Sequence, residues 1–274
     1  MRALRSTALA IALSLGAGAA AWAGGATETI DRTVKLRAGS QVVVLNLNGP
    51  VQVSAWDSPD VRLVAVKTAH AATEGRARAY LRDVQVKVEE TAGKLTIRTQ
   101  TPGSEGGIKG WLSCAGVDGS VAYRLTLPRE ARLAASTVNG NVVVVGLVAP
   151  VRAASTNGDV EIEVGGEVEA SSVNGSIRVA MQRADPRSAM ELSTVNGSIL
   201  VTVPSEFRAY VDARTTNGSV GSDLPVQVEG RRSRSRLIGK LNGGNTRLTL
   251  RTTNGSIWLR TQVDELAARR RSSS

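Results

Sequence analysis

One short motif, Ser/Thr-x-Asn-Gly, returns six times and constrains the fold more than any other feature of the chain. Eight of the 11 asparagines precede glycine, and chance alone would give roughly one such pair, because only 28 of the 274 residues are glycine. The six copies centre on Asn139-Gly140, Asn157-Gly158, Asn174-Gly175, Asn196-Gly197, Asn217-Gly218 and Asn254-Gly255. Such regularity indicates a repeated structural unit.

The residue types suggest what one unit looks like. Asn and Gly tolerate a positive φ, so each pair is expected to form a tight turn at little cost. β-Branched residues flank the turns and favour extended strands. After one turn, Val160 to Val164 alternates, which places three aliphatic side chains on one face and two glutamates on the other. Each copy therefore predicts strand, tight turn, strand, with one buried face.

The spacing of the motif favours one of two all-β folds. Successive asparagines from Asn139 to Asn217 lie 18, 17, 22 and 21 residues apart. A near-constant period of this length is typical of stacked units that share a core. We therefore expect a β-solenoid of stacked Asn-Gly turns with Ser/Thr and Asn ladders, and a β-sandwich of hairpins is the alternative. The interval of 37 to Asn254 predicts one long turn, or a corner that lacks Asn-Gly.

The first 23 residues are typical of a secretory signal peptide. Arg2 and Arg5 precede a small, apolar stretch, and Ala21-Trp22-Ala23 offers a cleavage site. An uncleaved anchor is the alternative, although the segment is short for a membrane span. We expect an exported protein, periplasmic or at the cell surface, without a transmembrane span in the mature chain.

The rest of the chain divides into three predicted regions. Residues 24–130 form a β-rich half with a short helix over 71–82 and a hairpin over 84–99. Residues 131–262 form the solenoid, and residues 263–274 form a basic, disordered tail. Aromatic residues are only 3% of the chain, so the core must consist of Val, Ile, Leu and Ala.

The charge suggests a class of partner. Loss of the two signal-peptide arginines lowers the net charge from +10 to +8, so the mature chain stays basic. An exported basic protein meets anionic envelope polymers and lipid head groups rather than nucleic acid; the alternative is an arginine-rich composition without a binding role. The candidate contacts are Arg231, Arg232, Arg234, Arg236, Arg269, Arg270 and Arg271.

The residues offer little for catalysis. The one histidine, His70, has no Gly-x-Ser-x-Gly motif to support a triad, and we expect it at the surface. Asp159, Glu161 and Glu163 are expected to face water rather than a metal. Cys114 is the single cysteine and is expected to be buried or inert, with an intermolecular disulfide as the alternative. No catalytic residue, cofactor or metal site is predicted.

The motif and the C-terminal segment together resemble a known family. Copies such as Thr194–Ile199 (Thr-Val-Asn-Gly-Ser-Ile), followed by Leu224-Pro225, Ile238-Gly239, Gly243-Gly244 and the pattern of residues 248–257, are similar to the bacterial putative-adhesin family. This is a secreted family of unknown function with β-solenoid domains. The resemblance implies the fold, export and a place in cell-envelope stress sensing, and it supplies no catalytic residue.

Three functions follow as hypotheses. The first is an exported, non-enzymatic envelope protein that acts as an adhesin-like binding or scaffold module. The second is a protein-interaction module in envelope stress signalling. The third and least favoured is a polysaccharide-active enzyme, because the predicted rungs do not gather the paired carboxylates which that chemistry requires.

Overall fold

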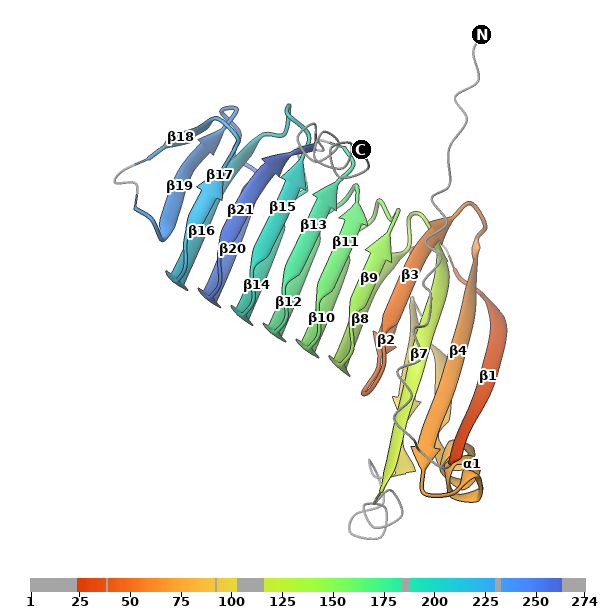
Figure 1. Cartoon of the computed structure of the whole chain (residues 1–274). Helices are drawn as coiled ribbons and strands as arrows, with labels where there is room; N and C mark the ends of the chain where they lie inside the picture. Colours follow the sequence, from red (N-terminus) through yellow and green to blue (C-terminus); the bar gives the residue numbers. More distant parts are fainter. Residues whose placement is uncertain are drawn as a thin grey trace, which may run out of the picture.

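We describe the protein from a computed structural model, over residues 24–37, 39–91, 93–102, 116–183, 188–229 and 233–262. The expected signal peptide, Cys114, Arg231, Arg232 and Arg269–Arg271 lie outside the described residues. Within them the chain is nearly all β, with two long sheets that face each other (Figure 1).

The first sheet, sheet A, contains ten strands. In spatial order they are β1 (Gly24–Lys35), β4 (Asp60–Ala71), β7 (Val117–Pro128), β3 (Val51–Trp56), β9 (Val142–Val145), β11 (Val160–Val164), β13 (Ile177–Met181), β15 (Ile199–Val203), β21 (Ile257–Thr261) and β17 (Val220–Ser222).

The second sheet, sheet B, contains eleven strands. In spatial order they are β18 (Val226–Val228), β19 (Arg236–Leu241), β16 (Ala209–Asn217), β20 (Arg247–Asn254), β14 (Met190–Asn196), β12 (Val168–Asn174), β10 (Val151–Asn157), β8 (Arg132–Asn139), β2 (Gln41–Leu45), β6 (Lys94–Gln100) and β5 (Gln85–Thr91).

Each repeat unit contributes one strand to each sheet. The chain runs along sheet B, turns at Asn-Gly and continues in sheet A, as from β10 to β11 and from β12 to β13. Equivalent strands of successive units pair in parallel, for example Val151 with Val168 in sheet B and Val160 with Ile177 in sheet A. This arrangement is the predicted β-solenoid, flattened to two faces, and the hairpin sandwich is wrong for the repeat region.

The core lies between the sheets along the whole stack. Val160, Ile162 and Val164 point inward and are fully buried, whereas Glu161 and Glu163 between them are exposed. The same alternation in the other strands produces one continuous, mainly aliphatic cluster from Val42 in β2 to Leu259 in β21, which also contains the buried rings of Tyr123 and Phe207. Each large apolar side chain contributes about 1.5–3 kcal/mol through burial.

The corners differ from the tight turns expected from the sequence. Asn242, outside the six-copy motif, is the one described non-glycine residue with a positive φ, at 50°. The motif asparagines instead end their strands in extended conformation, and each side-chain amide donates to the asparagine of the adjacent unit. Asn157 Nδ2 lies 2.8 Å from Asn139 Oδ1, and Asn174 Nδ2 lies 2.9 Å from Asn157 Oδ1.

This asparagine ladder is continuous. Its members, in spatial order, are Asn48, Asn139, Asn157, Asn174, Asn196, Asn254 and Asn217, joined by hydrogen bonds of 2.7–2.9 Å. The prediction of side-chain ladders is therefore confirmed. Asn-Gly recurs because the stack requires it: the motif asparagines keep an extended backbone, while Gly49, Gly140 and Gly255 have a positive φ.

Glycine follows asparagine because adjacent corners approach too closely for a side chain. A Cβ atom on Gly175 would lie 2.0 Å from the carbonyl oxygen of Gly158. That oxygen also accepts a hydrogen bond from the Ser172 hydroxyl at 3.0 Å. The Ser/Thr two residues before Asn thus holds the carbonyl of the adjacent corner, and the Gly after Asn leaves room for it.

The last two units are stacked out of chain order. In sheet B, β20 lies between β14 and β16, so the C-terminal unit is inserted beside a unit that precedes it in sequence (Figure 1). The interval of 37 positions from Asn217 to Asn254 includes β18 and β19, which pair antiparallel at the end of the sheet. This antiparallel excursion accounts for the interval, rather than the one long turn or the corner without Asn-Gly that the sequence suggested.

The N-terminal half continues both sheets. Strands β2 and β3 form the first unit, and Asn48 accepts a hydrogen bond from Asn139 Nδ2 at 2.7 Å. The expected hairpin is confirmed as β5–β6, and the expected helix as α1 (Glu74–Asp83), capped by the Thr73 hydroxyl. A boundary at residue 130 falls within continuous sheets, so the division into separate regions stays a prediction.

A buried lysine fixes the helix to sheet A. The Lys67 side chain in β4 is 5% exposed, and its Nζ donates to the carbonyl oxygens of Leu81 at 2.9 Å and Val84 at 3.2 Å. Its charge is compensated by Glu28 Oε2 in β1, 2.8 Å away. A cation at the C-terminal end of a helix also interacts favourably with the helix dipole.

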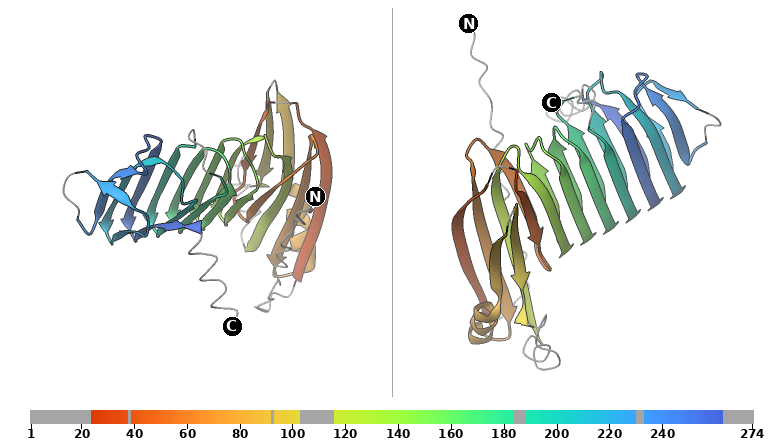
Figure 2. Two further views of the ribbon diagram at one scale, coloured as in Figure 1. Left: turned by 90° about the horizontal axis from the view of Figure 1, so that it is seen from above. Right: turned by 180° about the vertical axis from the view of Figure 1, so that it is seen from behind.

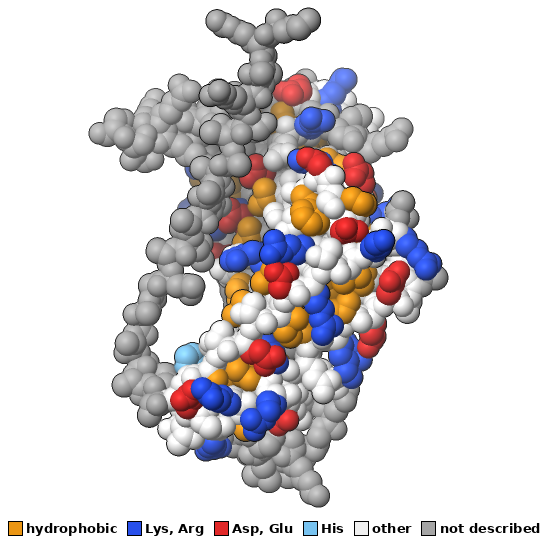
Figure 3. Space-filling view, turned by 90° about the vertical axis from the view of Figure 1, so that its right-hand side faces the viewer, with side chains coloured by type: hydrophobic (Ala, Val, Ile, Leu, Met, Phe, Trp, Pro, Cys, Tyr) orange, Lys and Arg blue, Asp and Glu red, His pale blue; other side chains and the backbone are white. Residues whose placement is uncertain are grey.

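Strand β1 forms the N-terminal edge of sheet A, next to β4 and α1 (Figure 2). In the view from this side, cationic and anionic side chains are interspersed with apolar ones (Figure 3). Asp31 in β1 pairs with Arg62 in β4 at 2.8 Å, and the arginine holds the pKa of that carboxyl below its usual range. Charged side chains on a long edge strand oppose uncontrolled pairing with other chains.

A buried tyrosine links the hairpin to the first unit. Tyr123 Oη lies 2.7 Å from Thr99 Oγ1, which donates to Asn46 Oδ1 at 2.9 Å. Asn46 in turn donates to the carbonyl oxygen of Val121 at 2.8 Å. Burial raises the pKa of Tyr123 to about 12, although the hydrogen bond with Thr99 lowers it slightly.

The close approach of the corners predicts the effect of adding one methyl group. We expect Gly175→Ala to destabilise the protein by about 3 kcal/mol or more, because the Cβ atom would overlap a backbone carbonyl. Gly165→Ala is the matched control, since its Cβ atom would lie 3.7 Å from Val148 Cγ1, an ordinary contact, and the expected loss is under about 1 kcal/mol. Urea unfolding compares the two, and equal losses would contradict this account of the corner.

The raised pKa of Tyr123 predicts a loss of stability at high pH. The folded protein retains the phenol proton up to about pH 12, whereas the unfolded chain loses it near 10. The contribution of Tyr123 to the free energy of unfolding is therefore fully present below pH 10. It is lost between pH 10 and 12, by up to about 3 kcal/mol. The free energy of unfolding, measured by urea denaturation from pH 10 to 12, should fall more steeply with pH in the wild type than in Tyr123→Phe. Parallel pH dependences in the two proteins would contradict the raised pKa of Tyr123.

Candidate binding surface

The outer face of the eleven-stranded sheet B is the candidate binding surface. Side chains that alternate with the buried ones point outward here, and those of neighbouring units fall into rows because the strands are in register. At the centre the rows consist of small residues, namely Ala134, Ser136, Ala154, Ser171 and Ser193. Short side chains leave this part of the face flat.

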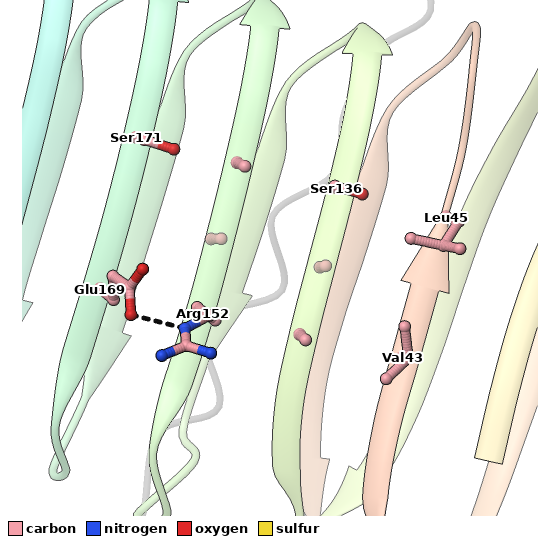
Figure 4. Close-up of a pocket in the computed structure, with 10 residues that line it drawn as sticks. Val43, Leu45, Ser136, Arg152, Glu169 and Ser171 are labelled. Atoms are coloured by element: carbon pink, nitrogen blue, oxygen red, sulfur yellow. Dashed lines mark hydrogen bonds and ion pairs between the residues drawn. The ribbon is translucent and has the colours of Figure 1, made fainter. Parts of the chain in front are cut away.

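A shallow hollow of about 160 Å³ lies over this centre (Figure 4). Val43 and Leu45 border it on β2, and Arg152 and Glu169 border it on β10 and β12. The last two form an ion pair that also lines an adjoining hollow of about 200 Å³. Both hollows are open and apolar to mixed in character, which suits contact with an extended partner better than enclosure of a small molecule.

A row of exposed aliphatic side chains borders the face along its Asn-Gly corner. Each residue lies one position before a ladder asparagine, so the repeat itself produces the row. Its members, with their exposed fractions, are Leu47 (41%), Val138 (37%), Val173 (42%) and Val195 (43%). We call these four residues the aliphatic row.

The C-terminal end of the face is basic. Strand pairing places Arg214 of β16 directly between Arg251 of β20 and Arg236 of β19, and all three are exposed. We call Arg251, Arg214 and Arg236 the arginine row. Asp212 pairs with Arg214 at 2.7 Å and with Arg251 at 3.4 Å, whereas Arg236 forms no ion pair among the described residues.

A second line of side chains crosses the same three strands, four residues from the arginine row along β16 and beyond Asp212. The register aligns Tyr210 of β16 with Arg247 of β20 on one side and Lys240 of β19 on the other. A hydrogen bond to the Glu229 carboxylate raises the pKa of Tyr210, as do desolvation and the nearby acidic charges. Lys240 Nζ lies 4.0 Å from Glu229, so this carboxylate is shared by the phenol and the amine.

The structure brings together only part of the predicted cationic set. Arg234 and Arg236 are exposed, and Arg236 begins β19 within the arginine row. The other predicted arginines lie outside the described residues. Arg214 and Arg251 were not predicted, although one signal points to them, because each lies three residues before a motif asparagine.

The residues considered for catalysis are dispersed. His70 lies half-buried in β4 of sheet A, opposite Asp118 of β7. Glu161 and Glu163 are exposed as expected, but Asp159 belongs to a corner, where its carboxylate accepts the Ser176 amide at 2.8 Å. Over the described ranges, no group of His, Cys, Asp and Glu side chains could hold a metal ion.

The exposed tryptophan lies on the opposite face from these rows. Trp258 in β21 points outward from sheet A and is 40% exposed, as its alternation with Ile257 and Leu259 predicts. The guanidinium of Arg260 lies 5.9 Å from its ring centre. A Cβ atom on Gly221 of β17 would lie 2.4 Å from the ring, so glycine makes room for it.

Among the described residues, no helix has the length and apolar composition that a membrane crossing needs. The model of the family described as Toastrack DUF4097 matches residues 131–260, which cover the repeat units from β8 to β21. No curated protein matches the chain.

Several solved structures share features with this chain at low identity. A "putative cell adhesion protein" from Clostridium sporogenes ATCC 15579 is 12% identical, with a TM-score of 0.46, over 86% of this chain and 100% of that one. A "putative adhesin" from Bacteroides fragilis NCTC 9343 is 12% identical, with a TM-score of 0.31, over 85% and 97% of the two chains. A "putative lipid binding protein" from Parabacteroides distasonis ATCC 8503 is 11% identical, with a TM-score of 0.32, over 84% and 96%.

The ion pair between the two hollows is expected to contribute little to folding. The Arg152 and Glu169 side chains are 68% and 51% exposed, and such pairs are worth about 0–1 kcal/mol. We therefore expect Arg152→Gln and Glu169→Gln to leave the urea midpoint nearly unchanged. A loss of more than about 2 kcal/mol in either variant would instead assign the pair a structural role.

Proposed function

We propose that the protein is an exported, non-enzymatic binding or scaffold module of the cell envelope, and the match of residues 131–260 to the Toastrack DUF4097 family model supports such a module. It presents the outer face of sheet B as a rigid surface and contacts anionic polymers or surfaces through the basic end of that face. The proposal takes its location from the signal-peptide pattern of residues 1–23.

One observation carries the electrostatic part of the proposal, namely the excess of cations on three adjacent strands. The outward side chains of β20, β16 and β19 include Arg247, Arg251, Arg214, Arg236 and Lys240. Asp212 is the one carboxylate among them on these strands, and Glu229 lies beside Lys240. A surface with this imbalance attracts anions, and the attraction weakens as salt screens it.

A non-enzymatic role is supported by the chemistry of the face. The hydroxyl groups near the hollow, Ser136 and Ser171, have no histidine beside them within the hollow's lining. The charged side chains there, Arg152 and Glu169, are paired with each other and well exposed. Activated nucleophiles and general bases require a closer arrangement and shifted pKa values.

The aliphatic row favours a second candidate, a protein-interaction module in envelope stress signalling. Val138, Val173 and Val195 are each more than a third exposed and lie in line along the corner. Exposed apolar side chains on a rigid edge, interrupted here by Thr156 between Val138 and Val173, suit a protein partner, because their burial is favourable and independent of salt. The two candidates therefore differ in their response to ionic strength.

An in-cell crosslinking pull-down of the exported protein, washed at low and at high salt, tests both candidates. The proposal expects anionic glycan or lipid at low salt and its loss at high salt. A single protein partner that survives high salt would support the second candidate, and Val173→Asp with Val195→Asp should then abolish its recovery. Val145→Asp, on an exposed valine of sheet A, is the matched control. Recovery of neither class would contradict both.

A further inference from the structure

We propose that the arginine row binds an acidic polysaccharide that lies across β20, β16 and β19, perpendicular to the strands. This inference rests on the proposed function and names the ligand class of its basic surface. It assigns contact roles to Arg214, Arg251 and Tyr210, which the sequence alone did not indicate.

The first step concerns the placement of like charges. Arg251, Arg214 and Arg236 occupy directly paired positions on neighbouring strands, about 4.8 Å apart in the backbone. Like charges directly opposite each other destabilise a sheet. Asp212 offsets part of this repulsion through Arg214 and Arg251, but it does not reach Arg236 within ion-pair distance. The row therefore retains positive charge that an anion can neutralise.

The second step concerns the shape of the ligand. Three guanidinium groups in a straight line suit an extended ligand whose negative charges repeat at a short interval. A polysaccharide with one carboxylate per sugar has this property, with an interval comparable to the strand spacing. The planar guanidinium also matches the carboxylate, since it can donate two parallel hydrogen bonds.

The third step concerns the second line of side chains. Tyr210 lies four residues before Arg214 along β16, so it faces outward about 13 Å from the arginine row, with Asp212 between them. Arg247 and Lys240 flank it, and Glu229 accepts its hydroxyl hydrogen bond. An aromatic ring with an apolar face and a fixed polar tip, set among cations, suits the face of an acidic sugar.

A polysaccharide fits this surface better than an anionic bilayer. Among the exposed large apolar side chains of the described residues, none lies on β16, β19 or β20. Attachment to a membrane surface is strengthened by apolar side chains that insert between the lipids. The exposed Val228 lies on the neighbouring edge strand β18, so β16, β19 and β20 themselves offer charge and one tyrosine but no exposed large apolar side chain.

The test measures binding of the purified full chain to polygalacturonate, with neutral dextran and phosphatidylglycerol vesicles as comparison probes. Arg236→Gln should weaken polygalacturonate binding about fivefold, and Arg214→Gln/Arg236→Gln/Arg251→Gln about 100-fold. The control variant is Arg62→Gln/Arg129→Gln/Arg178→Gln, which removes the same charge from arginines paired elsewhere. It should weaken binding only a few-fold.

The outcomes separate the inference from the proposed function. Equal weakening by both triple variants, or tight binding to vesicles without binding to polygalacturonate, would overturn the inference while leaving an anion-binding module. No salt-sensitive binding of the wild type to any of the anionic probes would overturn the inference and remove the electrostatic support for the proposed function. Arg236→Gln removes no ion pair of the described residues, so it remains informative if the triple variant does not fold.

Discussion

The stacking of one corner on the next is the interaction on which the rest of this structure depends. The Asn-Gly corners approach so closely that a glycine Cβ atom would overlap the neighbouring carbonyl oxygen, and three hydrogen-bond series use that closeness. Backbone amides of glycine donate to the next asparagine carbonyl, asparagine side chains donate along the ladder, and Ser/Thr hydroxyls hold the glycine carbonyl. Because each bond joins different units, the corners set a common register. That register aligns the buried aliphatic side chains within the core and the exposed ones on the face.

Much of this architecture was predictable from the sequence because the repeat consists of residue types with strong conformational preferences for strands and turns. The alternation of Val160–Val164 and the period of the motif identified the parallel stack, and the hairpin of β5 and β6 followed from its flanking turn. The conformation of the motif asparagines was predicted incorrectly. Asn-Gly pairs favour a left-handed turn locally, but here contacts between units hold the asparagines in extended strands, and only Gly49, Gly140 and Gly255 have a positive φ at these corners. Contacts between units cannot be read from one motif.

The candidate site was less predictable, for a topological reason. Arg214, Arg236 and Arg251 are distant in the sequence, and they become neighbours only because β20 enters between β14 and β16 while β19 returns antiparallel. The sequence instead indicated the arginines that are close together in the chain, from residue 231 to 236, as candidate contacts. The repeat did contain a hint, since Arg214 and Arg251 share the position three before asparagine. Lys67 and Glu28 were equally hidden, because their ion pair depends on the register of an edge strand.

The insertion of the last unit also sets a limit on how this protein can vary. In an ordinary solenoid, units follow one another in space as they do in sequence, so copies can be added at the end without disturbing earlier ones. Here β16 lies two strands away from β14 in sheet B, and β20, which comes later in the sequence, lies between them. The β20 strand pairs with β14, and Asn254 bonds to Asn196 across 58 residues of sequence. The final gap has room for one unit. The module is therefore closed in length, and its array of outward side chains has a fixed span.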